Sequence, residues 1–212
     1  MAVPIQDVPD HRELYLIAEQ QAGYVSASQA RRASFSRSLL SYHHSTGRFA
    51  RVRSGVYRLA RFPASPHEDL HIACLQVAPE AVISHDSALA LYELSDLLPA
   101  EVHLTARRSA SRRQPGIRLH TNRLRQEDVT RYEGLPVTTV QRTLADVASA
   151  GLADDQVRQA IQESLRRGLV TRESLLLMAA ERGERFRRLV DETLHEEGIA
   201  WVTARGPTSG AH

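Results

Sequence analysis

Helical and strand-like spacings of apolar residues alternate over the first 60 positions of the chain. Three helices are expected, at 10–22, 27–33 and 37–45. Ser26 and Ser36 stand where serine caps a helix N-terminus, and Gly23 stands where glycine ends a helix. Residues 49–54 and 56–59 then alternate around a glycine, which predicts a β-hairpin. This order of elements predicts a winged helix-turn-helix domain.

The proline-containing segment RFPASP, at 61–66, marks a change of pattern. Beyond it, helices are expected at 66–78, 84–94 and 140–150, and strands at 102–106, 117–121 and 135–138. Helical spacing then continues to about residue 197, broken near Gly168 and Gly183. The predicted fold class is α+β, with an N-terminal winged helix-turn-helix followed by a mixed α/β domain and a helical C-terminal segment. The corresponding boundaries are 1–62, 63–150 and 151–203, and residues 204–212 are expected to form a disordered tail.

Charge is distributed unevenly, although the net charge is only +2. Residues 1–62 contain nine arginines against four acidic residues, whereas 63–150 contain nine against eleven and 151–212 nine against ten. All 27 basic residues are arginine, which indicates a GC-rich genome more than a function. The stretch 26–59 has seven arginines and no acid, which favours a polyanion as partner. A further arginine-rich loop, 107–113, fits a second phosphate contact and a solvated loop equally well.

The expected third helix and the hairpin separate apolar from basic positions. Leu39, Leu40 and His43 share one side of the helix and are expected to lock it to the domain. The candidate DNA-contacting residues are Arg37, Ser38, Ser41, His44 and Arg48 on or beside the helix, and Arg51, Arg53 and Arg58 on the hairpin. Arg51 and Arg53 are two apart on one strand and are expected to point the same way. Because guanidinium groups suit both phosphate oxygens and guanine edges, the pattern favours double-stranded DNA over a merely solvated basic face.

A second motif favours different chemistry. Residues 67–71 read HEDLH and match H-E-x-x-H, which on a helix directs two imidazoles toward zinc and supplies a glutamate as general base. Two prolines lie just before it, so the helix only begins there, and a helix start with acids near its positive end is the simpler interpretation. A zinc hydrolase using His67, Glu68 and His71 remains the less favoured alternative.

Other motifs of catalysis or membrane insertion are not found in the sequence. It contains no P-loop and no G-x-G-x-x-G, and Ser84, His85 and Asp86 have the residue types of a triad only as neighbours in sequence. The single cysteine, Cys74, excludes an intramolecular disulfide and is expected to be a buried, inert thiol. No apolar run is long enough to span a bilayer, so we expect a soluble cytoplasmic protein without enzymatic activity, metal or cofactor.

Six segments occur in family order over about residues 11–150: QQAGYVSASQA, GRFARVRSGVYRL, PHEDL, AVISHDSALALYEL, VHLTARRS and GLPVTTVQRTLADVA. Together they resemble the AbiEi family of antitoxins. The pattern R-x-x-x-G-V-Y-R-L in the hairpin and the helix start V-T-T-x-x-R-T-L-x-D are the more specific parts. The resemblance implies a winged-helix domain that binds inverted repeats in its own promoter. It also implies a C-terminal domain that counteracts a co-encoded toxin with a nucleotidyltransferase-like fold.

Carried over by position, the resemblance implies a DNA-contacting set of Arg37, Arg48, Arg51, Arg53 and Arg58. The segments at 84–94 and 136–148 would belong to the antitoxin domain, where Arg142 and Asp146 are expected to form a structural ion pair. The last 60 residues match no motif of the family. The favoured hypothesis is therefore an autorepressor and antitoxin, and the main alternative is a winged-helix regulator with a sensor or dimerisation domain and no toxin partner.

Overall fold

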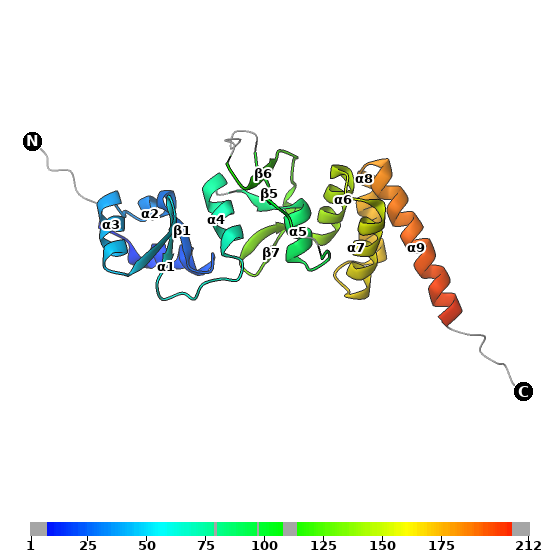
Figure 1. Cartoon of the computed structure of the whole chain (residues 1–212), viewed down its shortest axis with the longest axis horizontal. Coiled ribbons are helices and arrows are strands. Elements are labelled where there is room, and N and C mark those ends of the chain that lie inside the picture. The colour runs from blue at the N-terminus through cyan, green and yellow to red at the C-terminus, as the bar shows by residue number, and fades with distance from the viewer. Residues whose placement is uncertain (1–7, 79, 97, 108–113, 205–212) are drawn as a thin grey trace, which may run out of the picture. The chain divides into compact units, whose positions relative to one another are not determined.

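The computed structural model describes residues 8–78, 80–96, 98–107 and 114–204 (Figure 1). The chain forms two compact units, each built from several segments. One comprises Met1–Ile83, Leu104–Arg123 and Arg131–Pro136, and the other Ser84–His103, Leu124–Thr130 and Val137–His212. The α+β fold class predicted from the sequence is confirmed.

The first elements form the expected winged helix-turn-helix. They are α1 (His11–Glu19), β1 (Tyr24–Ser26), α2 (Ala27–Arg32), α3 (Arg37–Ser45), β2 (Phe49–Arg53) and β3 (Val56–Leu59). Both serine caps predicted from the sequence are present, since the side chain of Ser26 accepts a hydrogen bond from Gln29 N and that of Ser36 accepts one from Leu39 N. The three strands form an antiparallel sheet in the order β1-β3-β2.

A single apolar cluster holds the three helices against this sheet. Its buried members are Leu14, Ala18, Val25, Ala30, Ala33, Phe35, Leu40 and Phe49. They come from every helix and from two strands of the domain, so the angle between α2 and α3 is fixed by packing and does not depend on the turn alone. This cluster therefore sets the position of α3.

Gly23 marks the point where the end of the hairpin returns to α1. Its φ of +91° is readily adopted only by glycine, and its carbonyl accepts a hydrogen bond from Leu59 N at 2.9 Å. A Cβ atom added there would lie 2.3 Å from Cβ of Phe62. The absence of a side chain at Gly23 thus allows Phe62 to pack on the apolar cluster.

The unit that contains the winged helix continues through α4 (Glu68–Val77). The fully buried Tyr24 joins the two parts: its hydroxyl donates to Glu68 Oε2 at 2.7 Å, and its ring stacks on that of His71 with centroids 5.0 Å apart. The sequence prediction placed a boundary at residue 62 and a helix from 66. The helix instead begins at Glu68, because the Oγ atom of Ser65 accepts from His67 N and holds the two preceding residues in a turn.

Cys74 lies on the buried side of α4, and burial raises the pKa of its thiol to about 12. The thiolate is therefore negligible at neutral pH, as expected for an inert cysteine.

The second sheet has five strands in the order β6-β5-β4-β8-β7. Their bounds are β4 (Val82–Ile83), β5 (Val102–Thr105), β6 (Ile117–His120), β7 (Val129–Tyr132) and β8 (Leu135–Thr138). The sequence pattern predicted three of them and missed β4 and β7. A two-residue strand is too short to show a period, and β7 directly follows the short 3-10 helix η2 (Gln126–Asp128).

Helices make up most of the second unit. They are α5 (His85–Leu91), α6 (Val140–Ala150), α7 (Asp154–Arg166), α8 (Arg172–Glu181) and α9 (Glu184–Ala204), of which the last four pack together (Figure 1). The breaks predicted near Gly168 and Gly183 are confirmed as the ends of α7 and α8. The expected tail at 204–212 lies outside the described residues except for Ala204, as does the arginine loop at 107–113 except for Arg107.

Two residues of α6, Arg142 and Asp146, belong to a buried ion network. The Arg142 side chain is 1% exposed; its Nε is 2.9 Å from Asp146 Oδ1, which confirms the predicted pair, and its Nη1 is 2.7 Å from Asp128 Oδ2. Arg182 adds a second cation, 3.4 Å from Asp128 Oδ1. Burial raises the pKa of Asp146 in spite of the opposing effect of Arg142. Each charge in this network therefore depends on the others for compensation.

Replacing Gly23 by alanine should destabilise the protein by about 2–4 kcal/mol, since it adds the cost of a left-handed alanine to that of overpacking against Phe62. Gly47→Ala is the matched control. Gly47 also has a positive φ, +72°, but an added Cβ meets nothing within 4 Å, so a loss of only about 1 kcal/mol is expected. Urea denaturation of the two variants measures both values. Equal losses would show that Phe62 does not constrain Gly23.

Candidate nucleic-acid interface

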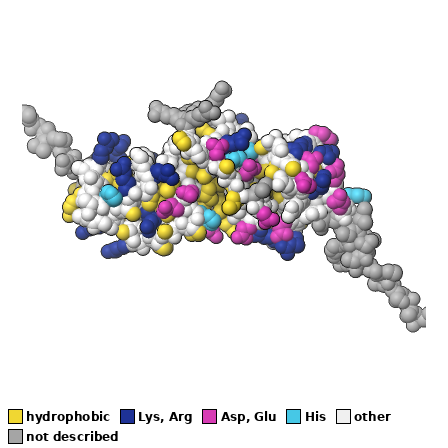
Figure 2. Space-filling model, viewed as in Figure 1, with side chains coloured by type: hydrophobic (Ala, Val, Ile, Leu, Met, Phe, Trp, Pro, Cys, Tyr) yellow, Lys and Arg dark blue, Asp and Glu magenta, His cyan; other side chains and the backbone are white. Residues whose placement is uncertain are grey.

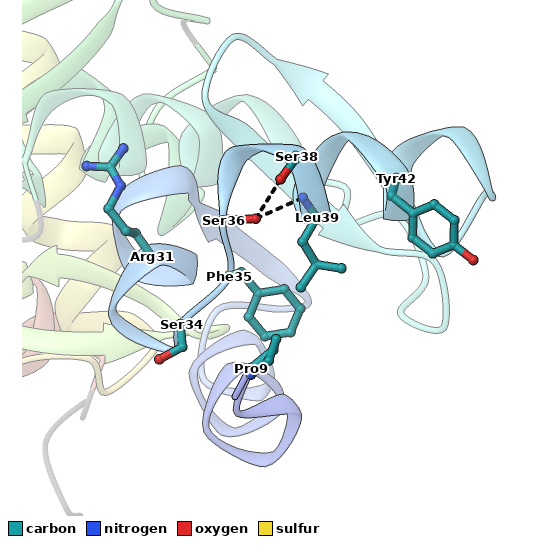
Figure 3. Close-up of a pocket in the computed structure, with 8 residues that line it drawn as sticks. All are labelled: Pro9, Arg31, Ser34, Phe35, Ser36, Ser38, Leu39 and Tyr42. Atoms are coloured by element: carbon teal, nitrogen blue, oxygen red, sulfur yellow. Dashed lines mark hydrogen bonds between the residues drawn. The ribbon is translucent and has the colours of Figure 1, made fainter. Parts of the chain in front are cut away.

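The N-terminus of α3 is built by a serine pair in the turn after α2. Ser36 Oγ accepts from Leu39 N at 3.1 Å and shares a hydrogen bond of 2.9 Å with Ser38 Oγ (Figure 3). The turn itself uses Ser34, whose φ is +62°, and the buried Phe35. Both hydroxyls are exposed at the positive end of the helix dipole, where an anion is stabilised.

The inner face of α3 is fixed by aromatic packing. His43 is only 3% exposed and lies against Phe49, with ring centroids 4.8 Å apart, and against Phe35 and His11 at 5.8 Å each. Neither of its ring nitrogens has a hydrogen-bond partner. Burial lowers the pKa of the His43 imidazole, and the charges of Arg48 and His11 lower it further. The ring is thus neutral and acts as part of the core, as the sequence pattern predicted for this side of the helix.

The outer face of α3 is polar and exposed. It carries all five residues predicted for the helix and its end, namely Arg37, Ser38, Ser41, His44 and Arg48. The ring of His44 is oriented by its Nδ1, which lies 3.3 Å from the carbonyl oxygen of Phe49. Among the described residues, no arginine from Arg12 to Arg61 forms an ion pair with a carboxylate. Figure 2 shows arginines over α1–α3, whereas acids and arginines intermingle over the C-terminal helices.

The two predicted arginines of β2 do not point the same way. Arg51 pairs with Tyr57, but the register shifts by one residue after it, so that Arg53 pairs with Val56. Paired residues of an antiparallel sheet share a face, and Val56 and Tyr57 are neighbours on opposite faces. The prediction from period-two spacing was therefore wrong, because one extra residue interrupts the alternation. Both side chains are exposed all the same.

Arg58 is set apart from the other predicted residues. It pairs with Tyr24 and Ala50, on the face of the sheet opposite to Tyr57. Its side chain is half-buried, and its Nη1 donates to the carbonyl oxygen of Phe62. This guanidinium stabilises the chain that leaves the hairpin, so the structure does not bring it to the surface formed by α3 and Arg51.

A hollow of about 440 Å³ lies between α2, α3 and the hairpin; we call it the wing-side hollow. Its lining includes the predicted residues Arg37, Ser41, His44 and Arg51, together with Ala27, Arg31, Phe35, Leu40, Ser54, Gly55 and Tyr57. The sequence prediction missed Arg31. It stands on α2, outside the helix and hairpin that were singled out, and only the packing of α2 beside α3 brings it here.

A second hollow, of about 680 Å³, lies on the other side of the α2–α3 turn (Figure 3). Arg31 also lines this turn-side hollow, with Pro9, Ser34, Phe35, Ser36, Ser38, Leu39 and Tyr42. Tyr42 is 56% exposed on the outer part of α3. Tyr42 follows Ser38 by four residues, a spacing that places both on one face of a helix. The sequence prediction missed Tyr42 because it considered only basic and short polar residues on that face.

Comparison with protein families finds a match that lies in this domain. Residues 12–60 match the family model AbiEi_4, described as "Transcriptional regulator, AbiEi antitoxin". They form an AbiEi-type regulator domain. The match begins at the second residue of α1 and runs to the end of the hairpin, so it contains α3, the whole three-stranded sheet and the arginines that line the two hollows. No curated protein sequence matches the chain significantly.

The HEDLH segment follows the AbiEi-type domain, and its side chains are directed to other partners. Glu68 accepts from the hydroxyl of Tyr24, and His71 stacks on the same ring. His67 stands before the first turn of α4, with its Nε2 3.0 Å from Glu133 Oε2. Within the described parts of the chain, no three His, Cys, Asp or Glu residues are grouped to hold a metal ion. His67, Glu68 and His71 thus each contact a different part of the chain: Glu133 for His67, and Tyr24 for Glu68 and His71.

No helix in the described part of the chain is both long and apolar enough to cross a bilayer.

The buried imidazole of His43 should make the stability of the AbiEi-type domain depend on pH. The unfolded chain binds a proton on this histidine near pH 6.5, whereas the folded domain resists protonation because its pKa is lowered. The stabilisation is complete above pH 6.5 and is lost as the pH falls toward the pKa of the folded state. We expect the free energy of unfolding to decrease between pH 7 and pH 5, and to decrease less in His43→Leu.

Urea denaturation at several pH values measures this dependence. His71→Leu is the necessary control, since burial and the nearby His67 lower the pKa of His71 to about 4 and act in the same direction. A pH dependence unchanged in His43→Leu but lost in His71→Leu would show that His43 is not the titrating group.

Proposed function

We propose that this protein is a DNA-binding transcriptional autorepressor that also serves as the antitoxin of a toxin–antitoxin pair. The observation that carries the DNA-binding part is the exposed arginine surface of α3 and the hairpin, which has no carboxylate partner among the described residues and lies within an AbiEi-type domain.

The proposed mechanism involves no covalent chemistry. The exposed arginines displace counterions from DNA phosphates and thereby supply affinity that depends on salt. The helix α3 enters the major groove, where the short side chains of Ser38 and Ser41 reach base edges. The capped N-terminus and the packed inner face hold α3 rigid, so its side chains meet the groove in a single orientation.

The antitoxin part of the proposal rests on the family match and on sequence resemblance. The segments at 84–94 and 136–148 resemble the AbiEi antitoxin domain, and both lie mostly in the second compact unit. We propose that this unit counteracts a co-encoded toxin with a nucleotidyltransferase-like fold.

A winged-helix regulator with a sensor or dimerisation domain is the second candidate. The exposed leucines of α8, Leu176 and Leu177, are 46% and 65% exposed and are compatible with such an interface. The two candidates share the DNA-binding domain and differ only in the partner of the second unit.

Replacing both Arg51 and Arg53 by alanine should weaken binding to the protein's own upstream DNA by about 10- to 100-fold at low salt. The plot of log affinity against log salt should become shallower by about 2, because each lost phosphate contact removes about 0.9 from the slope. Fluorescence anisotropy across a salt series measures both quantities with the full chain.

The matched control is the double variant Arg166→Ala, Arg187→Ala. It removes the same charge from exposed positions of the C-terminal helices, where each arginine pairs with a glutamate three residues before it. Its affinity and salt slope should equal those of the unaltered protein. The hairpin has no part in binding if both double variants behave alike.

Co-expression with the product of the adjacent reading frame tests the antitoxin part. If that product arrests growth, the full chain should restore growth, and the Arg51→Ala, Arg53→Ala variant should restore it equally well because it leaves the second unit unchanged. A chain that binds its upstream DNA but does not relieve the arrest would favour the sensor or dimerisation alternative.

A further inference from the structure

Three arginines from three different elements line the wing-side hollow. Arg31 comes from the last turn of α2, Arg37 from the first turn of α3 and Arg51 from β2. His44 and the hydroxyl-bearing Ser41, Ser54 and Tyr57 also line it. No carboxylate lines the hollow, and none of the three arginines has an ion-pair partner in the described part of the chain.

Such an arrangement favours a bound anion, because positive charges that line one hollow attract an anion and repel one another. Elsewhere this chain places arginines beside acids: Arg185 and Arg188 share Asp154, and Arg142 lies between two aspartates. The wing-side hollow differs in gathering cations without compensation. An oxyanion with several acceptor oxygens satisfies guanidinium groups that approach from different directions.

We propose that the wing-side hollow seats one phosphodiester of the DNA backbone and that Arg31 is one of its anchors, with Arg37 and Arg51. The inference rests on the proposed function and adds to it a residue from outside the recognition helix and the hairpin. A phosphate held between α3 and β2 fixes the register of the protein on the duplex, and Ser38 and Ser41 then face a defined set of base edges.

Arg32 offers a close control for Arg31. It is the next residue on the same helix, it is exposed, and it lines neither hollow. Both replacements by alanine remove one charge from α2, so the difference between them reports on position alone. Thermal unfolding of both variants should match that of the unaltered protein, since neither side chain is buried.

The experiment measures binding of the full chain to a duplex of its own upstream DNA by fluorescence anisotropy. Arg31→Ala should weaken binding about tenfold and make the salt slope shallower by about 1, as expected for one lost phosphate contact. Arg32→Ala should stay within about twofold of the unaltered protein. Arg31→Lys keeps the charge without the planar fork and should give an intermediate affinity.

A second arm identifies the phosphate. Single uncharged methylphosphonate linkages are placed in turn along the same duplex. At one position the modification should weaken binding by the unaltered protein, and it should weaken binding by Arg31→Ala by a clearly smaller factor, because the Arg31 contact is already lost there while Arg37 and Arg51 still face the phosphate. Equal behaviour of Arg31→Ala and Arg32→Ala, or the absence of any such position, would overturn the inference.

The experiment separates the inference from the proposed function. Failure of the unaltered protein to bind its upstream DNA would overturn both, whereas normal binding with an inert Arg31 overturns the inference alone. A third arm adds inorganic phosphate at constant ionic strength. Displacement of DNA from the unaltered protein but not from Arg31→Ala, with no coupled methylphosphonate position, would assign the hollow to a free phosphate and also overturn the inference.

Discussion

The charge on the surface of the winged helix depends on keeping its arginines away from carboxylates. The chain has no lysine, so arginine provides both the cations of buried ion pairs and the cations of the exposed surface. In α6 the guanidinium of Arg142 is buried and pairs with two aspartates, Asp128 and Asp146. On α2, α3 and β2 the guanidinium groups are exposed and unpaired in the described structure, and their full charge reaches a polyanion.

That charge is useful only because the surface beneath it is rigid. The inner face of α3 packs through Leu40 and His43 on a cluster contributed by all three helices and the sheet. Histidine is an unusual choice for this position, since its two nitrogens have no partner and its pKa must fall for it to stay there. The packing of α3 is thereby coupled to pH.

Much of the winged helix was predictable because its elements have local signatures. The serines before α2 and α3, the glycine at the hairpin and the helical spacing of the apolar residues each act over a few residues. The features that were missed depend on distant residues. Arg31 joins the site only through helix packing, Arg58 leaves it through a contact with Phe62, and the extra residue in β2 reverses the direction of Arg53. No spacing rule within one segment encodes these three outcomes.

The shift of register in β2 also changes which faces of the hairpin carry its arginines. A regular strand would direct Arg51 and Arg53 to one face and leave the other face to Arg58. The extra residue instead leaves Arg51 beside α3 and directs Arg53 to the far face. The irregularity thus separates two arginines of one five-residue strand, at the cost of one unpaired position in the sheet.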